Sequence, residues 1–162
     1  MLIKMNPSSR RTSGGFTLIE LMIVLVVLAI LVTVAVPSYR NYVLKANRAV
    51  AKGKLLELAS RQEQYFADNK IYSNTLDVFL GLGTTNARVD ANYNWVPVTS
   101  ADGIYQLSVV TAAVGGVNHM AYTLTATPVS AQADDAGKCA TFTLTNTGQR
   151  AATGSLGTEC WD

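Results

Sequence analysis

The spacing of apolar residues changes once along the N-terminal half of the chain. Residues 16–36 are apolar almost without interruption, and Glu20 is the only charge among these 21 residues. A helix of that length can span a hydrocarbon core of about 30 Å. After Pro37, apolar residues recur every three or four positions, opposite a basic face. This pattern predicts one helix ending near residue 67, apolar in its first half, amphipathic in its second, and bent at Pro37.

The C-terminal part of the chain alternates polar and apolar residues, as strands do. The runs 104–110, 119–127 and 139–145 alternate and are separated by turn residues. Residues 69–103 are rich in Asn, Thr, Gly and Asp, and we expect an irregular connector there, with one short strand near 93–98. A helix followed by an antiparallel meander predicts an α+β fold, with the sheet packed on the amphipathic half of the helix.

The charge of the chain is unevenly distributed. The 162 residues carry a formal charge of +2, but Lys4, Arg10 and Arg11 all precede the apolar run. Without these three, ten basic residues face eleven acidic ones, so no global basic field indicates nucleic acid. The three charges predict a cytoplasmic N-terminus and a periplasmic head.

The basic helix face at 40–54 has three interpretations. It is a solvated face with salt links to neighbouring subunits, a contact for anionic lipid headgroups, or a DNA-binding surface. Five charges with a single aromatic residue, Tyr42, among them make a weak nucleic-acid signal. We therefore favour the solvated face.

The start of the chain also allows three interpretations. A secretory signal peptide has an apolar run of 7–15 residues and an Ala-x-Ala-like cleavage site, and this chain departs from both. A plain signal anchor leaves Glu20 unexplained, because a carboxylate in the membrane costs about 2.5–3.5 kcal/mol. The third interpretation places cleavage before the apolar segment, which then stays on the mature protein.

Residues 14–39, GGFTLIELMIVLVVLAILVTVAVPSY, resemble the N-terminus of a type IV pilin of the class A type. The resemblance implies that a prepilin peptidase cuts after Gly15, removes the leader 1–15 and methylates Phe16. Pro37 matches the family's helix-bending proline. The fifteen-residue leader is longer than many pilin leaders, and a start at Met5 would shorten it to eleven.

The same resemblance gives Glu20 a role in assembly. The new amine at Phe16 would be costly in an apolar fibre core unless a carboxylate from a neighbouring subunit pairs with it. The implied partners are other pilin subunits, the prepilin peptidase and the inner-membrane assembly machinery. The implied location is the inner membrane before assembly and the extracellular pilus afterwards.

The residues alone leave the state of Cys139 and Cys160 open. They favour a disulfide in an oxidising compartment over two buried thiols or a metal pair supplemented by His119. The resemblance extends to the head through RQEQYFADNKIYS (61–73), YTLTATP (122–128), CATFTLTNTGQRA (139–151) and a terminal Cys-Trp, which are similar to the PilE-like minor pilins. In pilins the two cysteines bracket a C-terminal loop, so the resemblance implies a Cys139–Cys160 disulfide.

No stretch of the sequence carries a recognisable catalytic or cofactor motif. His119 begins a predicted strand, and Asp134-Asp135 indicates a solvated turn more than a calcium site. We expect neither an enzyme nor a bound cofactor or metal. The expected organisation is a cleaved leader (1–15), an apolar helix (16–36), an amphipathic helix (37–68), a connector (69–103), and a sheet with a disulfide-bonded loop (104–162).

The resemblance implies a structural subunit of a type IV pilus, most similar to minor pilins, that supports pilus assembly, adhesion or twitching motility. One alternative is a pseudopilin of a type II secretion system, and another is a DNA-receptor minor pilin for natural transformation. A signal-anchored periplasmic enzyme is the alternative from a different class, in which Glu20 would be dispensable.

Overall fold

One long helix dominates the N-terminal part of the molecule. The computed structural model describes residues 15–100 and 103–162, so the predicted leader lies outside the described residues except for Gly15. The chain divides into two compact units, residues 1–40 and 41–162, and α1 (Leu18–Asn69) belongs to both. The helix ends within two residues of the predicted position. Pro37 lies inside it, and the bend expected there stays a prediction.

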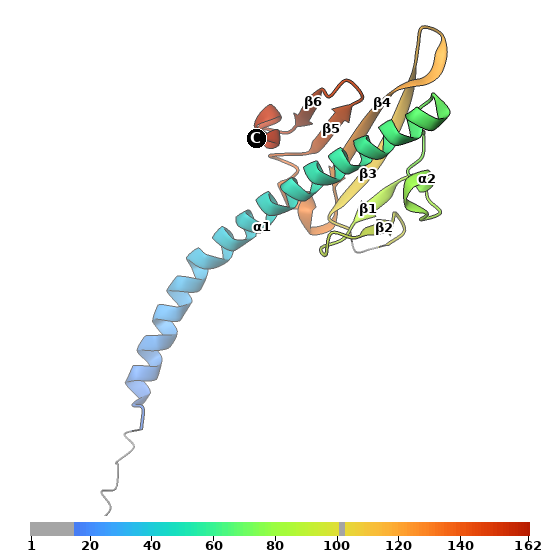
Figure 1. Ribbon diagram of the computed structural model, residues 1–162. Coiled ribbons are helices and arrows are strands. Elements are labelled where there is room, and N and C mark those ends of the chain that lie inside the picture. Colours follow the sequence, from blue (N-terminus) through green and yellow to red (C-terminus); the bar gives the residue numbers. More distant parts are fainter. Residues whose placement is uncertain (1–14, 101–102) are drawn as a thin grey trace, which may run out of the picture. The chain divides into compact units, whose positions relative to one another are not determined.

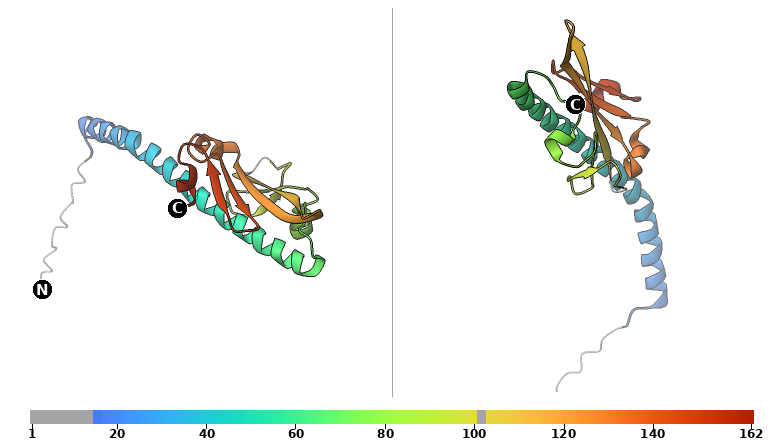
Figure 2. Two further views of the ribbon diagram at one scale, coloured as in Figure 1. Left: turned by 90° about the horizontal axis from the view of Figure 1, so that it is seen from above. Right: turned by 90° about the vertical axis from the view of Figure 1, so that its right-hand side faces the viewer.

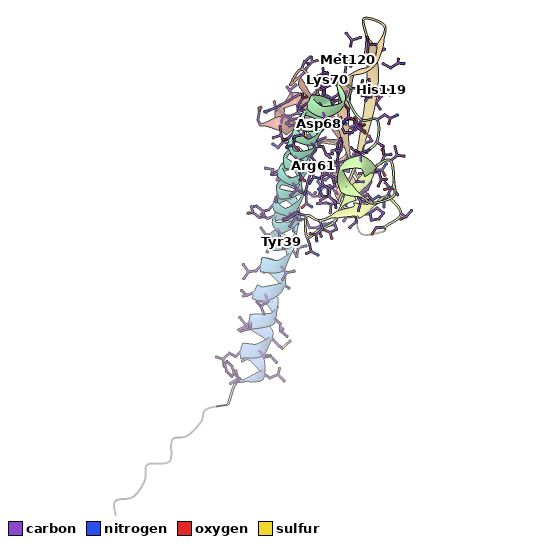
Figure 3. The ribbon with its side chains drawn as sticks, turned by 45° about the vertical axis from the view of Figure 1, so that its right-hand side comes forward. Tyr39, Arg61, Asp68, Lys70, His119 and Met120 are labelled. Carbon is purple, nitrogen blue, oxygen red and sulfur yellow. A yellow bond between two sulfur atoms is a disulfide. The ribbon has the colours of Figure 1, made fainter. Side chains whose placement is uncertain are left out.

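The first half of α1 has no apolar partner among the described residues. Its large apolar side chains are all exposed, from Leu18 to Val36, and Figure 3 shows side chains standing out around this part of the helix. The segment is long and apolar enough to cross a membrane. Because a helix that is apolar on every side needs an apolar environment on every side, this half requires lipid or other helices around it.

The second unit is built on one antiparallel sheet (Figure 1). The described residues form six strands in the order β2-β1-β3-β4-β5-β6, so the long β3–β4 hairpin lies at the centre, with β1 and β2 on one side and β5 and β6 on the other. The strands are β1 (Ala87–Val89), β2 (Trp95–Pro97), β3 (Tyr105–Val114), β4 (Val117–Pro128), β5 (Thr141–Thr145) and β6 (Arg150–Thr153).

The β3–β4 hairpin turns through two glycines. Val114 pairs with Val117, which leaves Gly115 and Gly116 as a two-residue loop. Both glycines have positive φ, 60° and 82°, the combination that the tightest hairpin turns require at both central positions. A β-branched or bulky residue at either position would strain this turn.

The second half of α1 packs on one face of the sheet (Figure 2). Ala51, Leu55 and Leu58 follow helical spacing and are almost fully buried. They share a core with strand residues that alternate along the sheet, among them Leu107 and Leu124. This arrangement confirms the predicted α+β fold, with a long helix packed on an antiparallel sheet.

The segment 69–103 differs from the expected connector. It holds a short helix, α2 (Asp77–Leu80), and two strands, β1 and β2. Only β2 matches the strand predicted near 93–98. Strand β1 has three residues and pairs with β3 as well as β2, so its alternation is too short to detect in a sequence, and a distant strand determines where it forms.

The C-terminal region also holds more structure than expected. Strand β6 was not predicted, because its residues Arg-Ala-Ala-Thr carry no apolar alternation. Two short 3-10 helices, η1 (Ser130–Asp135) and η2 (Gly157–Trp161), flank the last two strands. The third predicted strand begins at Thr141 rather than at Cys139.

A disulfide joins Cys139 to Cys160, as the resemblance implied. Both cysteines are buried, and the bond encloses β5, β6 and most of η2 in one covalent loop. The sequence separation is 21, and a loop of that size stabilises a fold by about 3 kcal/mol in the chain-entropy model.

We expect the double variant Cys139→Ala/Cys160→Ala to lower the free energy of unfolding by about 3 kcal/mol, because the unfolded chain regains the entropy of the open loop. Urea unfolding of the full chain in detergent, followed by tryptophan fluorescence, measures the change. Dithiothreitol should destabilise the wild type similarly and leave the double variant unchanged. Equal unfolding midpoints for the wild type and the double variant would contradict this account.

Candidate functional site

The first turn of α1 carries a capping motif that the sequence analysis missed. The helix begins at Leu18, and the Glu20 backbone N–H donates to Thr17 Oγ1 at 3.3 Å. Threonine followed by glutamate three positions later is the capping-box pattern. The bond found here involves only the backbone N–H of Glu20. Its carboxylate lies in the first turn of the helix, where a negative charge interacts favourably with the helix dipole.

These local interactions do not account for the cost of Glu20. A cap contributes about 1 kcal/mol, and a carboxylate near a helix N-terminus adds about 0.3–1 kcal/mol. A carboxylate within a membrane-spanning helix costs about 2.5–3.5 kcal/mol. The two local contributions together are smaller than this cost.

Gly15 and Phe16 precede the helix. Both are exposed, and neither belongs to a helix or strand. The Gly15–Phe16 peptide bond therefore lies outside the hydrogen-bonded backbone of α1.

An ion pair joins α1 to η1 in the second unit. The Arg48 guanidinium donates two hydrogen bonds to the Asp135 carboxylate, each at 2.6 Å. The hydrogen bonds from Arg48 to Asp135 raise the pKa of the arginine. Asp135 is 1% exposed, so the solvated turn predicted for Asp134-Asp135 is wrong for the second of these residues.

Gln132 extends this link into a buried polar network. Its side-chain oxygen accepts from Asn47 Nδ2 at 2.9 Å, and its amide nitrogen donates to the backbone oxygen of Leu44 and to the Tyr105 hydroxyl, each at 3.2 Å. Burial raises the pKa of Tyr105 to about 12. Because buried polar groups cost free energy unless they are paired, this network specifies how η1 lies against the helix.

A second polar cluster surrounds Glu57 on α1. Its carboxylate accepts hydrogen bonds from Lys54, Arg61 and Trp95. Burial of Glu57 opposes ionisation, but the hydrogen bonds from Lys54, Trp95 and Arg61, with the positive charge of Lys54, outweigh it and lower the pKa of the carboxyl. The cluster holds β2, at the edge of the sheet, against the helix.

The basic helix face is less solvated than predicted. Arg48 and Lys54 pair within the head, and Lys52 Nζ donates to the backbone oxygens of Trp161 and Asp162 at 3.0 and 3.1 Å. His119 lies in β4, where its Nδ1 is 2.6 Å from Thr111 Oγ1. Arg48 and Asn47 find their partners Asp135 and Gln132 more than 80 positions along the chain, so helical spacing alone could not reveal the ion pair or the Gln132 network.

Comparison with known proteins identifies the family. A model of the prokaryotic N-terminal methylation motif matches residues 10–36, and a model described as "Type IV minor pilin ComP, DNA uptake sequence receptor" matches residues 37–143, more than half of the chain. The chain belongs to this family of type IV pilins.

Relatives of this pilin include subunits of two kinds of assembly. The type IV wide pilus major component PilA4 of Thermus thermophilus is 31% identical over 56% of this chain and 69% of its own length. A type II secretion system core protein G of Pseudomonas aeruginosa is 41% identical over 41% of this chain, and the match spans about half of that protein (46%). A solved type IV pilin of Shewanella oneidensis aligns with a TM-score of 0.46 and 20% identity, over 74% of this chain and 98% of the other.

We expect Asp135→Ala to destabilise the head by about 3 kcal/mol, because it leaves the largely buried Arg48 charge without its partner. The double variant Arg48→Met/Asp135→Leu should recover most of that loss. Chemical unfolding of the full-length variants measures both changes.

Asp68→Ala is the matched control, because this carboxylate is exposed and its removal should change stability by less than about 0.5 kcal/mol. If Asp135→Ala were no more destabilising than Asp68→Ala, the ion pair would not hold η1 on α1.

Proposed function

We propose that this chain is a structural subunit of a type IV pilus, in the role of a minor pilin, and not an enzyme. The observation that carries the proposal is the exposed apolar half of α1, with a carboxylate in its first turn and Gly15-Phe16 directly before it. The methylation-motif match over this segment supports it. Adhesion and twitching motility are the activities that such a fibre would serve.

In this proposal, cleavage after Gly15 exposes the amine of Phe16, which is then methylated. Moving apolar surface from lipid into a bundle of like helices gains little, because lipid tails are as apolar as the helix side chains. Pairing between the Phe16 amine of one subunit and Glu20 of its neighbour gives the fibre its advantage over the membrane. Each charge is costly alone in an apolar medium and satisfied on assembly.

The proposed route has two stages. The subunit first spans the inner membrane through α1, with its head in the periplasm, where the prepilin peptidase processes it. The pilus machinery then transfers it into the extracellular fibre, where its partners are other pilin subunits. The pseudopilin alternative is supported by the similarity of this chain to a type II secretion system core protein G over 41% of its length. Recovery of the chain with secretion pseudopilins rather than in surface fibres would favour that alternative.

A second candidate function is DNA reception. It is favoured by the description of the matching family model as a DNA uptake sequence receptor. The head offers one exposed cation beside an aromatic ring, since Arg150 lies 5.4 Å from the ring centroid of Trp161. A cation next to a ring is a feature of surfaces on which nucleic-acid bases stack.

We expect Glu20→Gln to lower incorporation into sheared surface fibres at least tenfold, because the neutral side chain cannot pair with the amine of Phe16. Intact mass should show both proteins processed alike, each beginning at methylated Phe16. Membrane fractionation should show both inserted alike.

The control is Thr17→Ala, which removes the oxygen that caps the helix but keeps the carboxylate. This variant should assemble close to the wild-type level, because a cap contributes only about 1 kcal/mol. Normal assembly of Glu20→Gln would refute the pairing. Equal losses in both variants would indicate a general sensitivity of this end of the helix and not a pair of charges.

For DNA reception, we expect the full chain in detergent to shift duplex DNA on a gel, with affinity falling steeply between about 50 and 200 mM salt. Arg150→Gln should weaken binding and reduce the salt slope by about one. Lys70→Gln, at an exposed lysine near the end of α1, is the control and should change neither value. No shift at low salt would remove this second candidate.

A further inference from the structure

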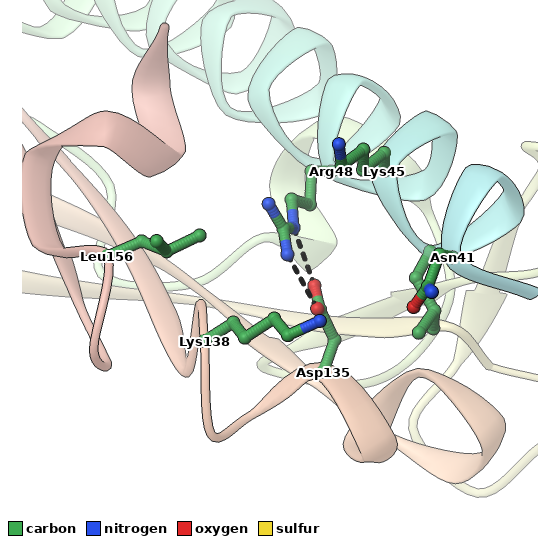
Figure 4. A pocket seen from close by; sticks show the side chains of 7 residues that line it. Asn41, Lys45, Arg48, Asp135, Lys138 and Leu156 are labelled. Carbon is green, nitrogen blue, oxygen red and sulfur yellow. Dashed lines mark hydrogen bonds and ion pairs between the residues drawn. The ribbon is translucent and has the colours of Figure 1, made fainter. Parts of the chain in front are cut away.

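One pocket of the head has no role in the function proposed above. It has a volume of about 320 Å³ and lies between α1 and the segments that follow η1 and β6, as Figure 4 shows. Its lining residues are Asn41, Leu44, Lys45, Arg48, Asp135, Lys138 and Leu156.

We propose that this pocket binds the phosphate of an anionic phospholipid headgroup while the subunit is held in the membrane. The inference rests on the membrane-anchored stage of the proposed function. It assigns the lipid contact, one of the three interpretations of the basic helix face, to this pocket.

The charges of the pocket favour an anion. Three cationic side chains and one carboxylate give it a formal charge of +2. Arg48 and Asp135 are engaged with each other. Lys45 and Lys138 are exposed, and no hydrogen bond or ion pair of their ammonium groups is found among residues 15–100 and 103–162. The two ammonium groups come from opposite sides of the pocket, Lys45 from α1 and Lys138 from the segment after η1. An anion bound between them would therefore interact with a positive charge on each side.

A neighbouring hollow shows why the first pocket is the better anion site. The two hollows share Lys45, Arg48 and Leu156. The second adds one cation, Lys52, and two acidic side chains. Lys52 already donates hydrogen bonds to backbone oxygens. The second hollow therefore attracts an anion less strongly than the first.

The position of the pocket along the chain indicates a lipid. Its first lysine, Lys45, follows Val36 by nine residues, about 13–14 Å along a helix. The headgroup layer on each side of a hydrocarbon core is about 5–8 Å thick, and a long basic side chain that tilts toward the helix N-terminus can reach back to it. Tyr39 and Tyr42 are 69% and 72% exposed, and exposed tyrosines just beyond an apolar span are typical of residues at headgroup depth.

The lining distinguishes a lipid from a bare anion or a nucleic acid. Leu44 and Leu156 contribute apolar surface beside the cations, which suits the glycerol and upper acyl part of a phospholipid. Stacking of nucleic-acid bases needs aromatic rings, and no aromatic residue lines this pocket in the part of the chain that the structure describes.

The test is native mass spectrometry of the full chain released from detergent micelles, titrated with phosphatidylglycerol or phosphatidylcholine. We expect phosphatidylglycerol to bind at least tenfold more tightly. Lys45→Gln and Lys138→Gln should each reduce that preference about three- to tenfold, and the control Lys70→Gln should leave it unchanged. Lys138→Gln is the decisive variant, because this residue lies far along the chain from the basic helix face.

Four results would overturn the inference. The first is equal binding of both lipids, and the second is loss of the preference for phosphatidylglycerol in Lys45→Gln but not in Lys138→Gln. The third is displacement of phosphatidylglycerol by inorganic phosphate at the same concentration. The fourth is binding of duplex DNA through the same two lysines more tightly than phosphatidylglycerol. The first two indicate diffuse attraction or none, the third a free-anion site and the fourth a nucleic-acid site. Failure of the anchored stage itself is seen separately, as a wild-type chain that does not insert into vesicles of either lipid.

Discussion

The structure depends on one constraint, that a single helix must satisfy two different surroundings. From Leu18 to Val36, α1 is apolar on every side and exposed on every side. From Ala51 onward it buries one face against the sheet and presents the other to solvent. Since α1 is one helix from Leu18 to Asn69, a single element of the chain must meet both requirements.

The head is attached to this helix by polar contacts as well as by apolar packing. The core of leucines and aromatics provides most of the burial, but apolar contacts tolerate sliding. The Arg48–Asp135 pair and the Gln132 network allow only one alignment of η1 along α1. At the other end of the packed helix, Gln62 is fully buried and exchanges two hydrogen bonds with the backbone of Ser73. Polar pairs at both ends of a hydrophobic contact thus define its register.

Features of the fold that are encoded locally could be predicted from the sequence, and those that depend on distant partners could not. The long helix, the central hairpin strands and the α+β class follow from periodicities that extend over many residues. Strand β1 is too short for its pattern to be distinguished, and β6 has almost no apolar alternation. Asp135 looked like a surface acid because Arg48 lies 87 positions away. The pattern of Thr17 and Glu20 could be recognised in the sequence, because a capping box is a local motif of four residues.

The disulfide has a mechanical consequence for a subunit of a fibre. Strand β6 lies at the edge of the sheet and pairs only with β5, and edge strands are the easiest to peel away under load. Because Cys139 and Cys160 bracket both strands, a pull on the chain bypasses the enclosed loop and is carried by the sulfur–sulfur bond. About 70 Å of extended chain is thereby withheld from stretching. The C-terminal part of the head can lose hydrogen bonds under tension without lengthening the path that bears the force.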